Sequence, residues 1–371
     1  GGSDPTKWIS AVVINESTRL GGKELLPRDI PALEESYYQP TVCSRASGVP
    51  RLEDSRDGAI ARIIGEEEHR MLAEPPDLAA LTQEGDGTVE LFPPGSDSGL
   101  VFLLGFDREV NGAFEIDVEA PAGTILDIAY DEEMYEGRLP VLINAYAFAD
   151  RYLLKEGRQT VGNVFAERGF RVVQVVFRNF SKPIKVHAVR GVDRLYPFVE
   201  QGTFACSDLK LNDLWGACVQ TIRACATDTF VDCPWRENAF YFNDLLVENV
   251  VALQLFGDSR LAARCFRLAA SQARPDGLIP AAIPCGILPG HTDLETERLL
   301  TLLAGNLCLP LMLEEYLLYS GETKLVSEIG GTVAGIVDAF SLWEDDDGLI
   351  EPPADYWNFV DWSFEFRPAD S

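Results

Sequence analysis

The sequence predicts a multidomain β-plus-α protein, in which an antiparallel β-sandwich is followed by stacked helical hairpins. Three observations predict this class. The chain has 371 residues, enough for about two domains. Apolar and charged residues alternate with a period of two through much of 99–203, and a helical period replaces this pattern from about residue 204. Hydrophobic residues make up 46 % of the chain and charged residues 24 %, which argues against wholesale disorder.

Residues 1–98 are predicted to be an irregular lead-in with short β segments. Prolines recur from Pro27 to Pro94 and leave little room for a long helix. The acidic run Glu66–Glu68 is expected to be a solvated surface.

Residues 99–203 are predicted to form the sandwich. Phe114, Ile116 and Val118 alternate with acidic residues, as in a half-buried strand. The turn at 121–123 separates this strand from another at 124–130. Glu156-Gly157-Arg158 is expected to join two strands, 151–154 and 159–161, as a β-hairpin.

Residues 204–371 are predicted to be helical. One helix is expected from a cap at Ser207 or Asp208 to about 226, and a second from about 238 to 256 with Gly257 as its C-terminal cap. Two similar units follow, each a helix between a glycine turn and an Asp-Gly turn, at 257–279 and 321–350. A long helix at about 292–319 connects them. This repeat is typical of a solenoid or of an α/α toroid.

The composition limits the classes of partner that the protein is expected to bind. The formal net charge is −28, which argues against nucleic acid or an anionic membrane and suits a neutral substrate. No run approaches the ~20 apolar residues of a membrane helix. Eight cysteines without CxxC spacing and three scattered histidines predict free thiols, no metal site and no cofactor. The free cysteines slightly favour the cytoplasm, and the compartment is otherwise not indicated.

The densest group of chemically active residues is Asp232-Cys233-Pro234-Trp235-Arg236-Glu237, followed by Asp244. On a helix beginning near 238, Glu237 and Asp244 would share one face. Aromatic neighbours raise a carboxyl pKa, as a general acid requires, and a second carboxylate stabilises an oxocarbenium-like transition state. The alternative is a helix cap with surface acids.

A second group contains Trp357, Asp361 and Trp362, just after the second Asp-Gly turn. Aromatic rings stack on the apolar face of a pyranose, and carboxylates bind its hydroxyl groups. The alternative is an apolar helix packed on its neighbour.

These residues carry a resemblance to bacterial α-L-rhamnosidases of glycoside hydrolase family 78. The run Asp232–Glu237 with Asp244 resembles the catalytic signature of that family. Further segments resemble it in the same order from about residue 26 to 362: Leu26–Pro31, Phe106–Val110, Ala120–Thr124, Glu167–Arg171, Arg274–Pro280 and Phe359–Trp362.

The resemblance implies an (α/α)6 toroid preceded by β-sandwich domains, and hydrolysis of terminal α-L-rhamnosides with inversion. Glu237 would be the general acid, and Asp232 and Asp244 would hold sugar hydroxyls and stabilise positive charge. Arg236 would orient the carboxylates. Together with Trp235, it would belong to the substrate-binding surface, while Trp357, Asp361 and Trp362 would line the sugar pocket.

The chain also departs from the family. Many members carry Gln at the position of Trp235, so the exact sugar is open. Inversion needs a second carboxylate as base, and the resemblance implies that only the first half of the toroid is present and that the chain is cut at both ends. The alternatives are a non-catalytic carbohydrate-binding protein or an inactive fragment lacking the base, and, less supported, an interaction module. The expected partner is a rhamnose-containing glycoside, with a homo-oligomer or a missing C-terminal half completing the exposed apolar helix faces.

Overall fold

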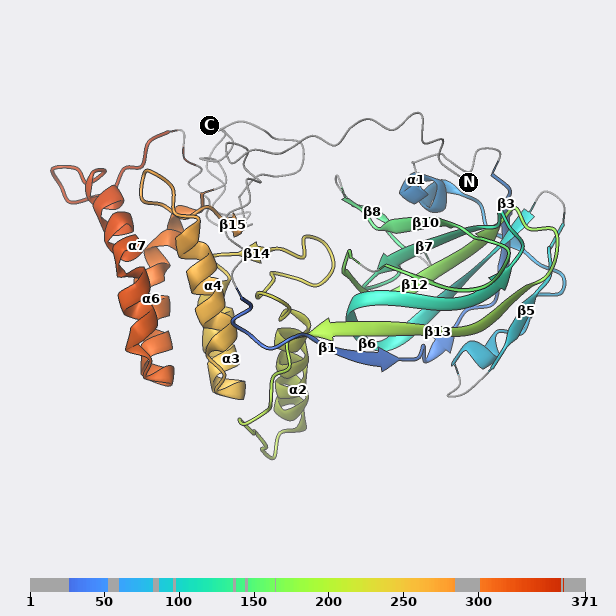
Figure 1. The fold of residues 1–371 in the computed structure, drawn as a ribbon, viewed down its shortest axis with the longest axis horizontal. Helices are drawn as coiled ribbons and strands as arrows, with labels where there is room; N and C mark the ends of the chain where they lie inside the picture. The colour runs from blue at the N-terminus through green and yellow to red at the C-terminus, as the bar shows by residue number, and fades with distance from the viewer. Residues whose placement is uncertain are drawn as a thin grey trace.

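A computed structural model describes residues 27–52, 60–82, 87–95, 98–135, 138–143, 146–163, 165–283, 301–354 and 356. The described chain has a β part and a helical part that meet at one end of the sheet (Figure 1).

The β part is one large antiparallel sheet whose main strand order is β1-β13-β6-β12-β7-β10. Five strands that precede residue 98 belong to it, since β1 and β5 pair with β13, β2 and β3 pair with β6, and β4 pairs with β3. The strands of this sheet are β1 Glu34–Tyr38, β2 Val42–Cys43, β3 Ser47–Pro50, β4 Arg70–Met71, β5 Val89–Leu91, β6 Ser98–Ala120, β7 Ile125–Asp131, β10 Ala149–Leu153, β11 Gly157–Gly162, β12 Arg168–Arg178 and β13 Ile184–Leu195. Three small elements lie beside it, the pair β8 Leu142–Ile143 and β9 Tyr146–Ala147 and the helix α1 Ile60–Glu66, and a 3-10 turn, η2, spans Ala79–Thr82.

Strand β6 holds the sheet together. Its first half pairs with β12 and its second half with β13. From Gly105 to Val110, β6 advances by five residues, whereas its partner β12 advances by only two. The strand is therefore strongly bulged there. Phe102, Phe114 and Ile116, from both halves, are fully buried in one apolar core. The predicted alternation of buried and polar residues along 114–118 is therefore confirmed.

The predicted hairpin around Glu156-Gly157-Arg158 is wrong. β10 pairs with β7, whereas β11 pairs with β6, so the two strands flanking the turn have different partners. Gly157 does take the expected left-handed conformation, with φ 92°. A turn signal fixes the reversal of the chain, and the pairing is decided by distant residues.

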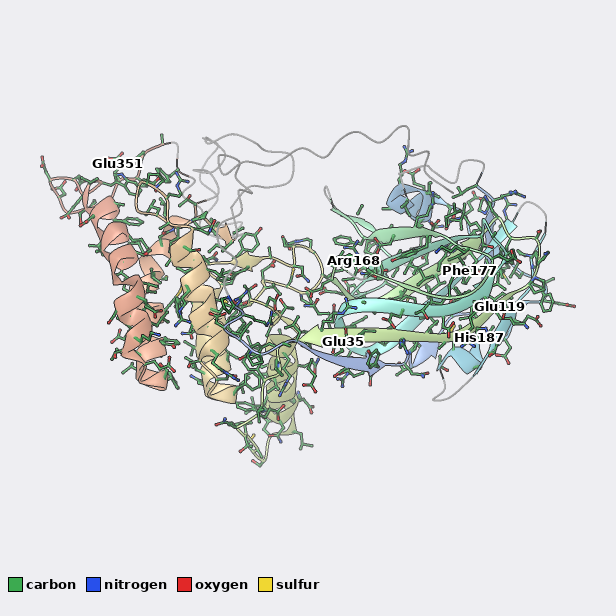
Figure 2. All side chains as sticks on the ribbon, in the orientation of Figure 1. Glu35, Glu119, Arg168, Phe177, His187 and Glu351 are labelled. Atoms are coloured by element: carbon green, nitrogen blue, oxygen red, sulfur yellow. The ribbon has the colours of Figure 1, made fainter. Side chains whose placement is uncertain are left out.

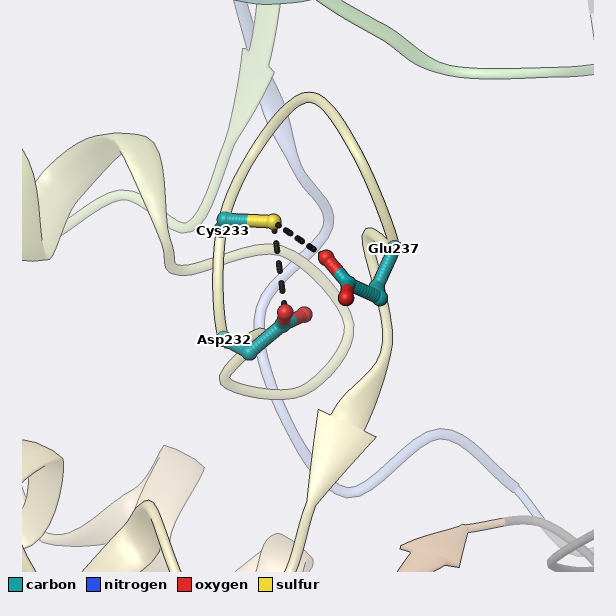
Figure 3. A group of neighbouring side chains, drawn as sticks. All are labelled: Asp232, Cys233 and Glu237. Atoms are coloured by element: carbon teal, nitrogen blue, oxygen red, sulfur yellow. Dashed lines mark hydrogen bonds between the residues drawn. The ribbon is translucent and has the colours of Figure 1, made fainter. Parts of the chain in front are cut away.

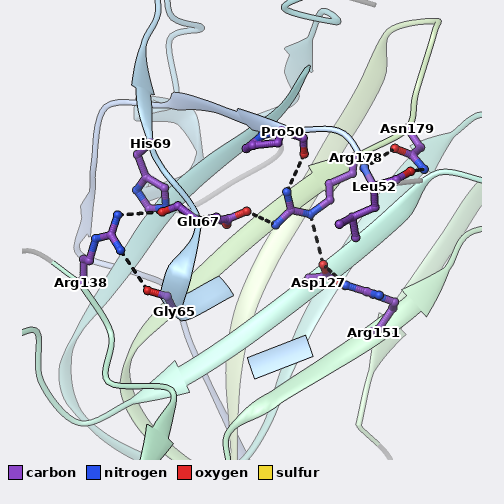
Figure 4. Close-up of polar contacts among 10 residues, drawn as sticks. All are labelled: Pro50, Leu52, Gly65, Glu67, His69, Asp127, Arg138, Arg151, Arg178 and Asn179. Atoms are coloured by element: carbon purple, nitrogen blue, oxygen red, sulfur yellow. Dashed lines mark hydrogen bonds and ion pairs between the residues drawn. The ribbon is translucent and has the colours of Figure 1, made fainter. Parts of the chain in front are cut away.

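The other face of the sheet contains a buried charge network (Figure 4). Arg178 is fully buried on β12 and binds Asp127 on β7 at 3.3 Å and Glu67 at 2.5 Å. Arg151 binds the other oxygen of Asp127 at 2.6 Å. Arg178 also donates to the carbonyl of Pro50 at 2.8 Å. Each buried charge is thus paired, which is the condition under which such charges are tolerated.

The helical part repeats one motif. The elements are α2 Leu209–Ala224, β14 Phe240–Tyr241, α3 Leu245–Phe256, α4 Arg260–Ser271, β15 Ala282–Ile283, α6 Leu303–Ser320 and α7 Thr323–Ser341. Gly257 and Gly321, at φ 63° and 70°, end α3 and α6 as left-handed caps. Each cap leads at once into a second helix, so α3/α4 and α6/α7 are two hairpins, and α3 contacts α6 while α4 contacts α7. The Asp-Gly turns at Gly277 and Gly348 also share positive φ, so the predicted repeat is confirmed.

The predicted helix over 238–256 begins seven residues late. Asn238 has φ 47°, and residues 240–241 form β14, which pairs with β15 beyond α4. Pairing with a distant segment therefore overrides local helical propensity here. The expected helix over 292–319 is α6 from Leu303, and its earlier part lies outside the described residues.

Several surface features bear on the sequence predictions. The described cysteines, Cys43, Cys206, Cys218, Cys225, Cys233, Cys265 and Cys308, are free as predicted, and Cys285 lies outside the described residues. No helix in the described part of the chain combines the length and apolarity needed to span a membrane. Leu211 and Leu214 on α2, and Leu311 and Leu318 on α6, are exposed apolar side chains.

Candidate active site

The predicted catalytic run lies on a loop between α2 and α3, directly against one end of the sheet. The loop closes on itself, because the backbone N–H groups of Asp232 and Ala239 donate to the Ala239 carbonyl and to Asp232 Oδ1, both at 3.0 Å. A β-carbon at Gly169 on β12 would lie 2.2 Å from the carbonyl oxygen of Pro234. Only glycine allows this close approach of loop and strand.

Two side chains fix the loop to the sheet. Trp235 stacks on Phe148 with ring centroids 4.6 Å apart, and its Nε1 donates to the carbonyl of Tyr130 at 3.4 Å. Asn238 donates to Asn111 of β6 at 3.2 Å. One ring face of Trp235, which we expected on the substrate-binding surface, is therefore occupied by packing. Arg168, labelled in Figure 2 at this end of the sheet, pairs with Asp150 at 2.8 Å.

Three side chains of the loop converge (Figure 3). The distances between a carboxyl oxygen of Asp232, the sulfur of Cys233 and a carboxyl oxygen of Glu237 are all within 4.8 Å. The Cys233 thiol lies between the two carboxyls, 3.2 Å from Asp232 Oδ2 and 3.3 Å from Glu237 Oε2. Burial raises the pKa of this thiol to about 12, so it keeps its proton and acts as a hydrogen-bond donor.

Arg236 binds the carboxyl of Glu237 at two points. Its guanidinium binds both oxygens of Glu237, at 2.8 Å from Nε and 2.7 Å from Nη2. Burial pushes the pKa of Glu237 up, but hydrogen bonds from Arg236 and Cys233 outweigh it and leave this pKa below its ordinary value. Burial raises the pKa of Asp232. Of the two carboxyls, Asp232 is therefore the easier one to protonate.

The same three side chains are the group of metal-binding types that the described residues bring together. A cation would have to displace the thiol proton of Cys233 and break the two bonds from Arg236 to Glu237. Both changes are costly, so the group is better suited to sharing a proton than to holding a metal.

Asp244 and Glu237 do not share a helix face, contrary to the prediction. Asp244 is the N-cap residue of α3, and Glu237 lies on the loop before β14. Asn243 donates to Asp244 Oδ1 at 3.1 Å.

The sequence analysis missed Glu248, one turn along α3 from Asp244. Glu248 is 9 % exposed, and its Oε2 has no hydrogen-bond partner among the described residues. Burial raises its pKa well above the ordinary value, and the nearby charges of Asp244 and Asp232 raise it further. The side chain of Glu248 therefore lies near both Asp244 and Asp232, two carboxyls of the predicted site. The available signal was a single acidic residue in the run 245–256, where Asn249 and Gln254 are the only other polar residues.

The second predicted group is only partly visible. Trp357, Asp361 and Trp362 lie outside the described residues. Tyr356, immediately before them, is buried and donates to Asp276 at 2.6 Å, and Arg274 binds the same carboxyl at 2.9 Å. These contacts hold the segment after α7 against the turn after α4.

Comparisons with known proteins agree with this arrangement. Residues 199–369 match the model of the bacterial alpha-L-rhamnosidase 6 hairpin glycosidase domain. The chain is 28 % identical to a GH78 family rhamnosidase of Bacillus sp. GL1, at a TM-score of 0.70, over 81 % of this chain and 30 % of that one. A search of curated proteins finds no match.

Two further solved structures are similar in fold. A rhamnosidase from Klebsiella oxytoca with rhamnose bound is 18 % identical, with a TM-score of 0.65, over 90 % of this chain and 61 % of that one. A Streptomyces avermitilis alpha-L-rhamnosidase complexed with L-rhamnose is 18 % identical, with a TM-score of 0.50, over 71 % and 26 %. The chain therefore spans less than two thirds of each of these relatives. Residues 199–369, just under half of the chain, are therefore similar to the helical domain of bacterial α-L-rhamnosidases, and the described fold is similar to that of the Bacillus GH78 rhamnosidase.

Proposed function

We propose that the protein is a glycoside hydrolase that cleaves terminal α-L-rhamnosides with inversion, with Glu237 as general acid. The observation that carries the proposal is the loop 232–237, in which Arg236, Cys233 and Asp232 all contact or adjoin the Glu237 carboxyl. The matched rhamnosidase domain supports rhamnoside as the substrate, and the Klebsiella and Streptomyces relatives have rhamnose bound in their structures.

In the proposed reaction, Glu237 gives its proton to the glycosidic oxygen as the bond to the anomeric carbon breaks. Because Glu237 is mainly ionised beside Arg236, it must first gain a proton. Asp232, whose pKa is raised, lies within 4.8 Å and can relay a proton from solvent to Glu237. Arg236 is half exposed, so a substrate can displace it. Asp244 and the ionised Asp232 then stabilise the positive charge on the sugar.

Inversion also needs a base that activates water, with a separation of about 6.5–9.5 Å between the two carboxyls. Asp232 is closer to Glu237 than this. The proposal therefore assigns the base to a carboxylate other than Asp232.

We also propose the architecture that this chemistry requires. The curved sheet is a β-sandwich, supported by the core that both halves of β6 enclose. The two hairpins α3/α4 and α6/α7 belong to an (α/α)6-type toroid, supported by their repeated caps and by the family model. In this arrangement, Trp357, Asp361 and Trp362 line the sugar pocket.

The test is hydrolysis of methyl α-L-rhamnoside, whose basic leaving group must be protonated, by the chain and by Glu237→Gln. We expect the chain to release rhamnose and the variant to do so at least about a hundredfold more slowly, which is the usual contribution of a general acid. Proton NMR of the first sugar released distinguishes inversion from retention. Equal rates in both proteins would reject Glu237 as the acid.

The low pKa of Glu237 favours a second candidate, a non-catalytic rhamnose-binding protein, because an ionised carboxylate is a good acceptor for sugar hydroxyls. This candidate predicts that rhamnose raises the melting temperature while no rhamnoside is hydrolysed.

A further inference from the structure

The Cys233 thiol contacts both carboxyls of the loop 232–237 but has no part in the proton transfer proposed for Glu237 (Figure 3). Its sulfur lies 3.2 Å from Asp232 Oδ2 and 3.3 Å from Glu237 Oε2. A thiol carries one proton and can donate it to one acceptor at a time. One of the two carboxyls must therefore be the acceptor of this proton.

The contacts of Asp232 indicate that Glu237 is the acceptor. Asp232 is the easier of the two to protonate, and a protonated carboxyl can itself donate to the sulfur. The other oxygen of Asp232, Oδ1, accepts from the backbone N–H of Ala239 at 3.0 Å, so this carboxyl is held in place without the thiol proton. The thiol is therefore left to donate to Glu237 Oε2.

The two oxygens of Glu237 are held by different donors. Arg236 contacts both, through Nε to Oε2 at 2.8 Å and through Nη2 to Oε1 at 2.7 Å, whereas Cys233 contacts Oε2. The Arg236 side chain is 45 % exposed and the Glu237 side chain only 15 %, so the guanidinium is the partner that a substrate can move. Once it has moved, Oε2 keeps its contact with Cys233, and Oε1 loses its contact with Arg236.

We propose that Cys233 is a positioning residue, whose thiol holds Oε2 of Glu237 so that Oε1 carries the proton to the glycosidic oxygen. This inference rests on the proposed function. In a protonated carboxyl, one oxygen bears the proton and the other remains an acceptor, so a donor on Oε2 places the proton on Oε1. A thiol is a weak donor, and it therefore orients the carboxyl while opposing its protonation less than a second cation would.

The test compares Cys233→Ala, which removes the donor, with Cys233→Ser, which restores one. The control is Cys225→Ala, which removes a buried thiol that precedes the loop. Each protein is given two substrates: methyl α-L-rhamnoside, whose leaving group must be protonated, and p-nitrophenyl α-L-rhamnoside, whose leaving group departs with little help. The pKa of Glu237 is measured by 13C NMR, and thermal melting verifies folding.

We expect Cys233→Ala to lower kcat for the methyl glycoside about tenfold, because a misdirected proton donor is costly. The loss should be smaller for the nitrophenyl glycoside, and KM should change little. The same variant should raise the pKa of Glu237, because a donor to its ionised form is lost while Arg236 and Asp232, which also act on this carboxyl, are unchanged. Cys233→Ser should restore kcat and the pKa toward the wild type, and Cys225→Ala should alter neither.

Three results would each overturn the inference: an unmoved Glu237 pKa in Cys233→Ala, equal losses for the two glycosides, or a Cys233→Ser variant that behaves like Cys233→Ala. A thiol that only packs the loop would give these results, since its loss would change the melting temperature alone. If none of the proteins hydrolyses either glycoside while the pKa of Glu237 still rises in Cys233→Ala and returns in Cys233→Ser, the proposed function fails and the hold of Cys233 on this carboxyl stands.

Discussion

At the scale of single residues, the site depends on how protons are distributed among its carboxyls. Glu248 is the most buried of them, and its pKa is raised well above the ordinary value. A raised folded-state pKa means that folding takes up a proton. The resulting stabilisation is complete below the unfolded pKa of about 4.3 and is lost as pH rises above it.

Glu248→Gln should therefore flatten the pH dependence of stability. The amide keeps the shape of the protonated acid and cannot ionise, so we expect the variant to be more stable than the wild type at pH 8 by about 1 kcal/mol or more, with a difference that shrinks toward pH 4. Urea unfolding at both pH values measures this. Glu314→Gln, exposed on α6, is the control. A variant that loses stability at pH 8 would show that the charged form of Glu248 is needed.

Arg236→Gln should raise the pKa of Glu237, because the guanidinium that favours the ionised carboxyl is removed. A general acid acts in its protonated form, so the alkaline limb of kcat/KM should move to higher pH. Arg236→Lys keeps the charge but not the two-pronged contact and should move the limb less. Carboxyl titration by 13C NMR reports the same shift independently of turnover, and an unmoved Glu237 signal would contradict this account.

At the scale of elements, the close contact between loop and sheet makes a sharp prediction. Gly169→Ala forces its β-carbon into the backbone of Pro234 and should lower the free energy of unfolding by roughly 1–3 kcal/mol. Gly216→Ala on α2, where a β-carbon has open space, should be neutral or stabilising. Chemical unfolding compares the two, and similar effects of both substitutions would mean that the loop yields easily.

The same scale shows what the sequence could predict. The period of two along β6 and the glycine turns at Gly257 and Gly321 depend on nearby residues, and the sequence predicts them correctly. The pairing of β10 with β7, and of β14 with β15, depends on segments far apart in the chain, and there the predictions failed. Local propensity cannot decide between partners that only the fold brings together.

The features of the candidate site likewise divide into those that the sequence predicts and those that depend on contacts between distant segments. Its residue types and their order identified Asp232 and Glu237, which the structure does bring together. The side that Trp235 presents and the place of Glu248 follow from contacts between loop, helix and sheet. These contacts carry no local signal in the sequence.

At the scale of the whole molecule, the net charge of −28 and a set of buried acidic residues both lower the stability of the fold as the pH rises. Burial raises the pKa of Glu109 to about 8, of Asp131 to about 7 and of Asp193 to about 6. Each stabilises the fold when protonated, so this contribution is present below about pH 4 and is lost as pH rises through 6 to 8.

We therefore expect the melting temperature to fall between pH 5 and pH 8. Added salt should recover the part that comes from repulsion between surface charges, because salt screens exposed charges far better than buried ones. Glu109→Gln should reduce the part that salt does not recover. Calorimetry over this grid of conditions is the measurement, and stability that rises toward pH 8 would contradict the prediction.

The exposed leucines predict self-association. Leu211→Glu with Leu214→Glu on α2 should shift the sedimentation profile toward monomer, because contacts between apolar helix faces are replaced by repulsion. Leu349→Glu, on an exposed turn, is the control. A wild-type chain that sediments as a monomer at all concentrations would reject this expectation.

The contact of the loop with Gly169 and Asn111 also limits how this protein can be dissected or recombined. The family model begins at residue 199, and a gene fragment cut there would encode the acid-bearing loop without the surface on which it is moulded. Grafting the helices onto the β part of a relative would meet the same difficulty unless a glycine and an asparagine stood at the matching positions. The β part and the helical part therefore depend on each other. We expect an exchange of domains among these relatives to give a folded protein only when both sides of this contact come from the same parent.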